Sequence, residues 1–482
     1  MEGRTHFHLI GIGGIGLSAI AKVLLEEGQR VSGSDLKLSP ITDGLVTLGA
    51  KVYEGHRAEN VGDADLVIVS SAIPAGNREA AAAREKGVPV VKRDWMLGRM
   101  MEGRFGIAVA GSHGKTTITA MIALVLTEAG LDPSFIVGGI LENLGTNAKA
   151  GRGKHFVVEA DEYDRTFLGL KPRIAVVTNI EMDHPDCYPK LDDVVEAFRE
   201  FLDLVPANGC VIGCGDEEMV RGMLGARALR LRPALSGTKG SGQAQGSRGA
   251  REQGLNVVTY GLGEGVDWRA VDIRPSEGVG SNFVALQEGQ PVGEFTLRIP
   301  GLHNVQNALA ALAVADRLGL DLTDVRKTLR RFRGVKRRFE VKGEVDGIVV
   351  IDDYAHHPTQ IRTTLATARK CYPDREVWAV FQPHTYSRTR ALLAQFVRSF
   401  ADADHVIVTD IYPAREFDDL GVSAADIVAR MKHPDARYIS GLNEAADHLL
   451  NRLRPGDVLI TLGAGDGYTV GEGILAELEE KR

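Results

Sequence analysis

Residues 110–117 read AGSHGKTT, and this stretch constrains the fold more than any other. It follows an apolar run at 105–109, typical of a buried strand, and precedes a helical pattern from 116 to about 129. A glycine-rich turn between strand and helix, ending in Gly-Lys-Thr, is typical of phosphate binding. The loop is shorter than a standard P-loop, because its first glycine is Gly111. We expect an ATP site in which Lys115 reaches the outer phosphates and the Thr116 hydroxyl binds Mg²⁺.

The length of 482 residues suits about three domains. We expect boundaries that give units of residues 1–103, 104–333 and 334–482. A net charge of −7 excludes a general attraction to nucleic acid or to anionic membranes. The four cysteines have no paired spacing, and neither a signal peptide nor an apolar run of transmembrane length is found. These observations predict a cytoplasmic globular enzyme with reduced thiols. A monomer or weak homodimer is our expectation for its assembly, which these observations do not determine.

The N-terminus carries a second phosphate motif. A strand at 6–10 runs into Gly11, Gly13 and Gly16, which satisfy G-x-G-x-x-G, and a second strand ends at Ser34 and Asp35. This is the dinucleotide fingerprint in its usual context, so NAD is one possible ligand. A UDP-sugar offers the same pyrophosphate and ribose. The small residues SSAIP at 70–74, after a strand at 65–69, would allow close approach to a ligand, although a plain strand end is the favoured interpretation of this segment alone.

Two acidic clusters follow strands of the central unit. We expect a linker at 103–106, and then a strand at 155–158 that ends in EADEYD, with Glu159, Asp161 and Glu162. A strand at 173–178 ends in NIEMDH, whose last residue is His184. Because ligands bind at the carboxyl ends of strands in open α/β sheets, both clusters should lie beside the P-loop. Carboxylates there suit Mg²⁺, and a histidine could complete a second cation site.

Three further segments fall between the central and third units. Residues 236–254 are rich in Gly, Ser and Gln, and we expect a surface excursion without chemistry. A helix opening at about His303 places His303, Asn304 and Asn307 on one face, suited to a purine edge, although Asn304 alone also fits a helix cap. Its apolar positions include Leu309 and Leu320. GVKRRFE at 334–340 is basic, and a solvated linker is the simple interpretation.

Two strands of the third unit end in clusters of ionisable residues. The strand at 347–351 is followed by DDYAHHP, and the strand at 376–381 is followed by QPHTYSRTR. Buried polar groups need partners, so these ends are hard to explain by packing. They indicate a site that binds a small zwitterion or a transferring phosphoryl group.

Taken together, AGSHGKTT, EADEYD, NIEMDH, GLHNVQNALAA, RRF, DDYAHHP and QPHTYSRTR resemble the Mur ligase family over nearly the whole chain. GIGGIG, DYAHHP and FQPHTYSRTR most resemble its alanine-adding members. The resemblance implies an α/β fold of three domains: an N-terminal Rossmann-like UDP-binding domain, a central P-loop ATPase-like domain and a C-terminal Rossmann-like α/β domain. It implies an ATP- and Mg²⁺-dependent ligase of peptidoglycan precursor synthesis. The substrates would be UDP-N-acetylmuramate, activated as an acyl phosphate on its lactyl carboxylate, and L-alanine.

The resemblance also assigns residues. The implied catalytic residues are Lys115, Glu159, His184, His356 and Arg388. ATP would be bound by Gly111, Ser112, His113, Gly114, Lys115, Thr116, Thr117, His303, Asn304, Asn307, Arg338 and Asp353. The UDP substrate would be bound by Gly11, Gly13, Gly14, Ile15, Gly16, Ser34, Asp35, Ser70, Ser71 and Ala72. L-Alanine and the acyl phosphate would contact Tyr354, His356, His384 and Arg388. Thr116 and Glu159 would hold one Mg²⁺, and Glu159 and His184 a second.

One position departs from several sister ligases. They carry a carbamate-modified lysine fourteen residues after the histidine of the Asp-His motif, where this chain has Phe198, as the alanine-adding members also lack that lysine. The carbamate mechanism therefore does not carry over. Because ATP contacts would come from two units, we expect the third domain to close on ligand binding. The alternatives are a tripeptide-adding recycling ligase of the same family, an NAD-dependent oxidoreductase using GIGGIG, and a UDP-sugar sensor with slow ATPase activity.

Overall fold

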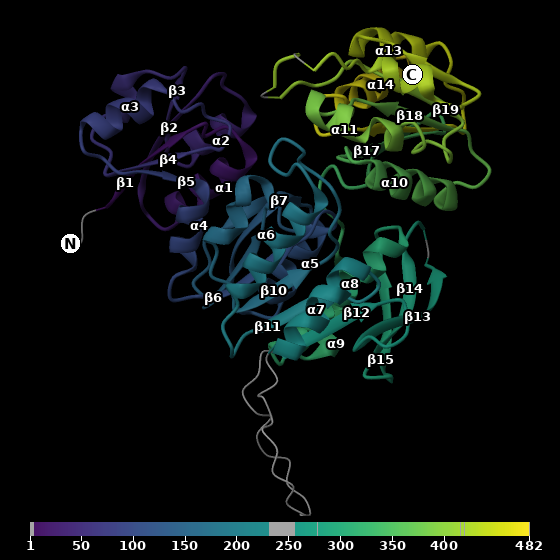
Figure 1. Cartoon of the computed structure of the whole chain (residues 1–482). Coiled ribbons are helices and arrows are strands. Elements are labelled where there is room, and N and C mark those ends of the chain that lie inside the picture. The colour runs from purple at the N-terminus through teal and green to yellow at the C-terminus, as the bar shows by residue number, and fades with distance from the viewer. Residues whose placement is uncertain (1–3, 231–255, 277, 415, 419, 482) are drawn as a thin grey trace, which may run out of the picture.

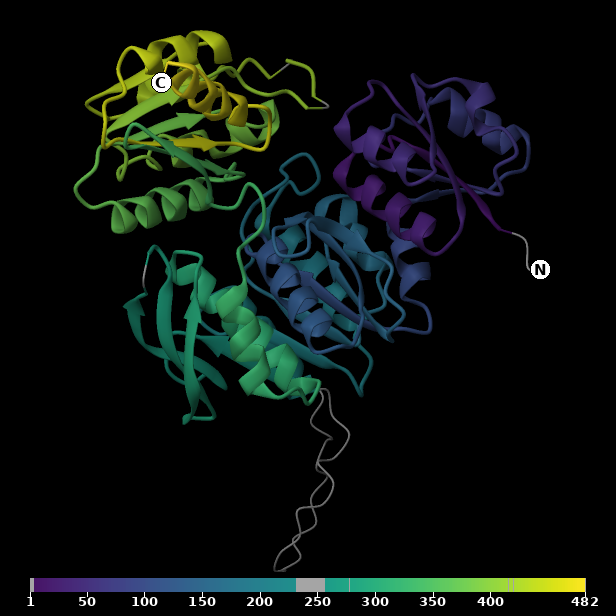
Figure 2. The same cartoon turned by 180° about the vertical axis from the view of Figure 1, so that it is seen from behind.

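Three sheets follow one another along the chain in the computed structural model, which describes residues 4–230, 256–276, 278–414, 416–418 and 420–481. Both terminal sheets lie above the central unit in the view of Figure 1, the N-terminal one at the left and the C-terminal one at the right. Figure 2 shows the same arrangement from behind. The mixed α/β architecture with mainly parallel strands confirms the predicted fold class.

The N-terminal sheet has five parallel strands in the order β3-β2-β1-β4-β5. The strands are β1 (His6–Ile10), β2 (Arg30–Asp35), β3 (Lys51–Glu54), β4 (Leu66–Val69) and β5 (Val90–Lys92). The helices are α1 (Ile15–Glu26), α2 (Pro40–Thr47), the 3-10 helix η1 (Ala58–Val61), α3 (Arg78–Glu85) and α4 (Arg93–Met101). The strand order reverses between β1 and β4, so the GIGGIG loop after β1 lies at the switch point where such sheets bind ligands.

The central sheet has ten strands in the order β15-β14-β13-β12-β11-β10-β6-β9-β7-β8. The strands are β6 (Phe105–Ala110), β7 (Ser134–Leu141), β8 (Thr146–Lys149), β9 (His155–Glu159), β10 (Ile174–Val177), β11 (Cys210–Cys214), β12 (Asn256–Gly261), β13 (Trp268–Pro275), β14 (Ser281–Gln287) and β15 (Gln290–Leu297). The helices are α5 (Lys115–Glu128), η2 (Tyr163–Gly169), α6 (Leu191–Asp203), α7 (Glu218–Arg230), α8 (Leu302–Arg317) and α9 (Leu322–Arg331). Strand β6 lies between β9 and β10, which brings both acidic strand ends beside the P-loop.

The third sheet has six strands in the order β16-β17-β21-β18-β19-β20, all parallel except β16. The strands are β16 (Glu340–Val345), β17 (Ile348–Asp353), β18 (Val377–Phe381), β19 (His405–Val408), β20 (Ala436–Tyr438) and β21 (Val458–Leu462). The helices are α10 (Pro358–Cys371), α11 (Tyr386–Phe396), α12 (Ala425–Arg430), α13 (Leu442–Leu450) and α14 (Tyr468–Glu480). The loops after β17 and β18 carry DYAHHP and QPHTYSRTR.

An apolar core joins the N-terminal and central units. Met96, Leu97, Met100 and Met101 of α4 are buried in one cluster with residues of α1 and with Phe198 of α6. A second core lies on the other face of the central sheet, beneath α5 and α8, and the third sheet has its own cores. The N-terminal sheet is therefore packed onto the central unit through α4.

Several expectations about local structure need correction. The predicted linker at 103–106 is wrong in its second half, because Phe105 already begins β6. Leu320 lies beyond the end of α8 at Arg317 and is only partly buried. The predicted excursion at 236–254 lies outside the described residues. Among the helices that the structure describes, none has the length and apolar character required to cross a bilayer.

Candidate active site

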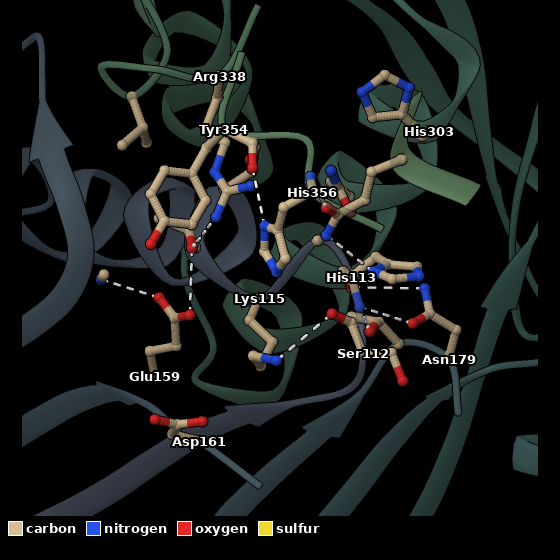
Figure 3. Close-up of a pocket in the computed structure, with 18 of the residues that line it drawn as sticks. Ser112, His113, Lys115, Glu159, Asp161, Asn179, His303, Arg338, Tyr354 and His356 are labelled. Atoms are coloured by element: carbon tan, nitrogen blue, oxygen red, sulfur yellow. Dashed lines mark hydrogen bonds between the residues drawn. The ribbon is translucent and has the colours of Figure 1, made fainter. Parts of the chain in front are cut away.

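A cavity of about 570 Å³ lies where the three units meet, and Figure 3 shows many of its side chains. Its walls include Ile15 and Gly16 of the N-terminal unit, the P-loop of the central unit, and Arg338 and His356 from the third part of the chain. The acidic clusters and the third-unit clusters thus face one space, although they are distant in sequence.

The P-loop is hydrogen-bonded to the two residues that follow β10, Thr178 and Asn179. Gly111 and Gly114 have φ values of 137° and 83°, in the left-handed region that favours glycine. A Cβ at Gly111 would overlap the Thr178 hydroxyl, which donates to the His113 carbonyl at 2.6 Å. The Asn179 side chain accepts from the His113 N–H at 2.8 Å (Figure 3). The loop leads into α5, whose N-cap, Gly114, provides no side-chain acceptor, so its first N–H groups are suited to a phosphate.

Lys115 is paired with an acid that the site prediction did not assign. Its Nζ lies 2.8 and 3.0 Å from the two carboxylate oxygens of Glu162, which is buried. Burial alone would lower the pKa of Lys115, but the charges of Glu162, Glu159 and Asp161 outweigh it and raise the pKa. The Lys115 amine is therefore charged. EADEYD contained the signal for Glu162, since it ends a strand beside the P-loop.

Thr116 and Glu159 lie together, as the predicted first metal site requires. The Thr116 hydroxyl donates to Glu159 Oε1 at 3.1 Å and accepts from Arg338 Nη2 at 3.2 Å. The Gly138 N–H donates to Glu159 Oε2 at 2.9 Å (Figure 3). A hydroxyl and a carboxylate oxygen suit Mg²⁺. The linker interpretation of 334–340 is wrong for Arg338, because this side chain reaches the P-loop.

His184 lies near a different acid from the one predicted. Its Nε2 is 4.0 Å from Glu162 Oε1 and 3.8 Å from Asp183 Oδ2, and its backbone has φ of 53°, unusual for a residue with a side chain. Among the described residues, no hydrogen bond or ion pair joins His184 to Glu159 directly. Phe198 is fully buried and packs edge-on against Phe167 at 5.3 Å between ring centroids. Phe198 is therefore a core residue and does not line the cavity.

Arg388 of α11 is buried against the central unit. Its Nε and Nη2 each lie 2.8 Å from Asp183 Oδ1, and its Nη1 lies 3.1 Å from His384 Nδ1. Burial would raise the pKa of Asp183, but Arg388 and His184 hold it well below its usual range. Asp183 was part of NIEMDH but was not predicted as a site residue.

Of the other residues in the predicted alanine site, His384 and His356 lie near Arg388, whereas the Tyr354 ring lies beneath Arg338, with 5.1 Å between the guanidinium carbon and the ring centroid. His356 Nδ1 lies 2.8 Å from the Tyr354 carbonyl oxygen, so Nδ1 carries the proton and Nε2 keeps its lone pair (Figure 3). Burial, with Arg388 and His384 nearby, holds the pKa of His356 well below its usual range, so the ring is neutral. The His356 and His384 rings are 5.9 Å apart, and His384 stacks on Tyr412. Tyr412 was not predicted from the sequence.

Asp353 is buried and bonded to the protein. It accepts hydrogen bonds from the Phe339 N–H, the Ala355 N–H and the Thr364 hydroxyl at 2.9–3.1 Å. Burial raises its pKa to about 6, against the opposing effect of Arg338. Asp353 lines the cavity, but these bonds show that it also holds the loop carrying Tyr354 and His356.

The predicted adenine residues lie on the first turns of α8 and line the cavity. Asn307 Nδ2 donates to Asn304 Oδ1 at 3.0 Å, and Asn304 Nδ2 donates to the Pro300 carbonyl. The helix cap is Gly301, so the capping alternative for Asn304 is wrong. Burial lowers the pKa of His303 to about 4, which keeps its ring neutral at pH 7.

The predicted UDP residues meet at the carboxyl edge of the N-terminal sheet. Gly11 lies against Ser70, and the Gly13 N–H donates to Asp35 Oδ2 at 2.9 Å. Ser34 is an exception, because its hydroxyl is buried and bonded to Glu79 rather than facing a ligand. Of this group only Ile15 and Gly16 line the cavity itself; the others lie outside its walls.

His113, Glu181 and His357 form a second polar cluster at the boundary with the third unit, with ligand atoms within 4.8 Å of one another. The hydrogen bonds favour a protein network over a metal site. Gln360 Oε1 accepts from two backbone N–H groups, so its amide must donate to His113 Nδ1 at 3.0 Å. His113 Nε2 then carries the proton and faces Glu181 at 3.5 Å. To bind a metal ion through Nε2, His113 would need its proton on Nδ1 instead.

Models of known protein families match most of the chain. The Mur ligase family, catalytic domain, matches residues 6–105, the Mur ligase middle domain matches 109–235 and 242–315, and the Mur ligase, glutamate ligase domain, matches 337–465. The chain belongs to the Mur ligase family, which confirms the resemblance seen in the motifs.

Two curated relatives are named UDP-N-acetylmuramate–L-alanine ligase. The protein of Geotalea uraniireducens is 44% identical over 98% of both chains, and that of Syntrophobacter fumaroxidans is 45% identical over 98% of this chain and 96% of its own. A UDP-N-acetylmuramate-alanine ligase from Thermotoga maritima has a similar structure, with a TM-score of 0.80, 28% identity and coverage of 99% and 100%. A murein peptide ligase from Psychrobacter arcticus has a TM-score of 0.71, 25% identity and 98% coverage of both chains.

Proposed function

We propose that this chain joins L-alanine to the lactyl carboxylate of UDP-N-acetylmuramate, using ATP and Mg²⁺. The observation that carries the proposal is the shared cavity, which the P-loop, Glu159 and Arg388 all line. The alanine-adding relatives, similar over 98% of the chain, support the choice of substrates. An oxidoreductase built on GIGGIG explains neither the P-loop nor the buried Arg388.

The reaction needs several anions in one place. The γ-phosphoryl group of ATP would pass to the substrate carboxylate, giving ADP and an acyl phosphate, so charge neutralisation and positioning dominate. Lys115 would supply one positive charge and the N-terminus of α5 another. Thr116 and Glu159 would hold one Mg²⁺ and His184 would help hold a second; the metal's role is to neutralise phosphate charge. The carboxylates beside His184 Nε2 are Asp183, at 3.8 Å, and Glu162, at 4.0 Å.

The second step joins the amine. The amine of L-alanine would attack the acyl carbon, and the tetrahedral intermediate would release phosphate and leave an amide. Arg388 is positioned to hold the amino-acid carboxylate or the departing phosphate. The His356 Nε2 lone pair would accept a hydrogen bond from the amine, and the departing phosphate would take the proton that the amine loses.

The compartment and the domain limits remain parts of the proposal. None of the four cysteines forms a disulfide, which agrees with a reducing, cytoplasmic setting. The proposed domain boundaries after 103 and after 333 fall between the three sheets. A monomer or weak homodimer remains a prediction.

The decisive assay measures ADP release with UDP-N-acetylmuramate, Mg²⁺ and ATP, comparing L-alanine with the tripeptide L-Ala-γ-D-Glu-diaminopimelate. We expect turnover that requires L-alanine. Turnover only with tripeptide would instead assign a recycling ligase, and ATP hydrolysis that ignores both would assign a sensor. If no ADP were released with either L-alanine or tripeptide, and the protein quenched NADH fluorescence, the results would support the oxidoreductase.

A further inference from the structure

Gln360 connects the P-loop to the third unit, and none of the sequence motifs includes it. It lies in the first turn of α10, and it lines the cavity. Its Oε1 accepts from the His356 N–H at 3.0 Å and from the His357 N–H at 3.2 Å. Its Nε2 donates to His113 Nδ1 at 3.0 Å, across 247 residues of sequence. One side chain is thus bonded to both the nucleotide loop and the DYAHHP loop.

Helix capping explains only one end of this side chain. Gln360 and His357 form a capping box at the start of α10, and glutamine is a usual residue at this position. A glutamate would cap the helix equally well, because the cap uses only the acceptor oxygen. The NH₂ group serves His113 instead. The amide therefore has a second role that the cap does not require.

The donor end of Gln360 orients a ring of the P-loop. His113 directly precedes Gly114, the N-cap of α5, and only 12% of its side chain is exposed. Because its Nδ1 accepts from Gln360, its Nε2 carries the proton and faces Glu181 at 3.5 Å. Glu181 also accepts from the Thr359 hydroxyl at 2.7 Å. The His113 ring is therefore held between the loop after β10 and the first turn of α10.

The acceptor end of Gln360 holds the backbone of His356. The His356 ring is bonded through Nδ1 to the Tyr354 carbonyl at 2.8 Å, so both its backbone and its ring are fixed. His113 and His356 line the same cavity (Figure 3). The His356 ring is also the group proposed above to accept from the amine of L-alanine. A displacement of Gln360 would therefore move this ring relative to the amine.

We propose that Gln360 is a positioning residue that couples the ATP site to the amino-acid site. The inference rests on the proposed function for the identity of both ligands. Phosphate groups in the P-loop fix the position of the His113 ring, and the Gln360 amide transmits that position to the His356 backbone. Because a coupling free energy is reciprocal, an ordered amino-acid loop favours ATP binding to the same extent.

The first measurement locates the proton on His113 by nitrogen NMR of the full chain labelled at histidine. We expect the proton on Nε2 in the wild type, because Nδ1 accepts from the Gln360 amide. Gln360→Glu keeps the helix cap but offers His113 no donor, so Nδ1 should carry a proton in this variant. If His113 remained protonated only on Nε2 in Gln360→Glu, the contact would be refuted.

The second measurement is the KM for L-alanine in a double-mutant cycle. Gln360→Leu and His113→Phe each remove the bond between the two side chains, and each should raise this KM by about 3- to 10-fold. In the double variant the second change should add less than about twofold, because the bond is already absent. Calorimetry should show that Gln360→Leu weakens an ATP analogue by a similar 3- to 10-fold.

Ser423→Ala is the matched control for the loss of a helix-end contact in the third unit. The Ser423 hydroxyl accepts from the Ala425 N–H at the start of α12, and Ser423 does not line the cavity. This variant should lower Tm while the KM for L-alanine changes by less than about twofold.

Three outcomes would overturn the coupling. A higher KM in Gln360→Leu but not in His113→Phe would leave Gln360 as a helix cap. Factors that multiply in the double variant would show two independent roles, and a weaker ATP analogue with an unchanged KM would confine Gln360 to the nucleotide site. A wild-type chain without L-alanine-dependent turnover would instead contradict the proposed function, and the NMR result would still test the contact between Gln360 and His113.

Discussion

Arg388 and Asp183 form a buried ion pair between the third and central units, with two guanidinium nitrogens 2.8 Å from one carboxylate oxygen. They are 205 residues apart in sequence. The pair joins the loop after β10, beside the P-loop, to the helix that follows β18. The residue proposed to bind the amino acid is thus oriented by the unit that binds ATP.

Replacing Arg388 should disable the second step. Arg388→Ala removes a charge that we propose would face the acyl phosphate, and we expect kcat to fall by about 100-fold or more. It also leaves Asp183 buried without its partner, so the unfolding free energy should fall by about 3 to 5 kcal/mol. Arg388→Lys should restore stability more than kcat. ADP release against L-alanine concentration, with thermal melts, separates the two effects; wild-type kcat in Arg388→Ala would remove this residue from the reaction.

The Thr116 hydroxyl should set the Mg²⁺ requirement. Chelation of divalent cations is expected to stop turnover completely. Thr116→Ala should raise the Mg²⁺ concentration for half-maximal activity by about tenfold, equivalent to about 1.4 kcal/mol for one lost ligand. Thr116→Ser keeps the hydroxyl and is the matched control. An identical Mg²⁺ titration for the alanine and serine variants would contradict the metal assignment.

His357 should make stability depend on pH. It is buried, its Nδ1 accepts from the Thr359 N–H at the start of α10, and burial, with His113 nearby, lowers its pKa to about 4. An ordinary histidine titrates near 6.5, so the unfolded chain binds a proton first as pH falls. Stability is therefore intact above about pH 6.5 and falls between there and about pH 4, by about 2 kcal/mol at pH 5.

The variant His357→Asn isolates this effect, because Asn caps helices without titrating. We expect it to match the wild type at pH 7.5 and to lose less stability at pH 5. The measurement is Tm at both pH values, with His433→Asn in the third unit as a control for general acid effects. If Tm fell by the same amount from pH 7.5 to pH 5 in the wild type and in His357→Asn, another group would control the transition.

Ligands should compact the chain. ATP is expected to be contacted by the P-loop and by Arg338 at the start of the third unit, so binding favours the conformation in which these approach. Closure also excludes water from the acyl phosphate. Small-angle scattering with an ATP analogue and UDP-N-acetylmuramate should show a smaller radius of gyration than the free chain. No compaction would contradict the closure hypothesis.

The sequence predicted the elements that carry glycine loops and strand ends, because these have local signatures. AGSHGKTT marks the turn between β6 and α5 within one or two residues, and NIEMDH follows β10 as expected. The order of strands in the central sheet was not predicted from the sequence alone, since pairing of β6 with both β9 and β10 is a non-local property. That pairing is what places Glu162 beside Lys115.

Residues that prediction missed are bonded to segments distant in the sequence. Arg337, from the same basic cluster as the predicted Arg338, is bonded to Asp352 of the third sheet at 2.9 Å. Gln360 of α10 belongs to no motif, and its amide is bonded to His113 of the P-loop. These contacts join segments separated by tens to hundreds of residues, which no local pattern encodes. For Ser34, the sequence correctly predicted a place near the end of a strand, β2. It did not predict that the Ser34 hydroxyl is bonded to Glu79.

The apolar core through α4 has a mechanical consequence. The N-terminal and central units share buried methionines, whereas the third unit is joined to the central one at the cavity by polar contacts such as Arg388 to Asp183 and Thr359 to Glu181. Water can replace a polar contact but not a buried apolar one. The molecule should therefore move as two rigid pieces rather than three. The UDP-sugar and ATP would both bind to the piece formed by the N-terminal and central units. The amino acid would bind to the third unit and move with it.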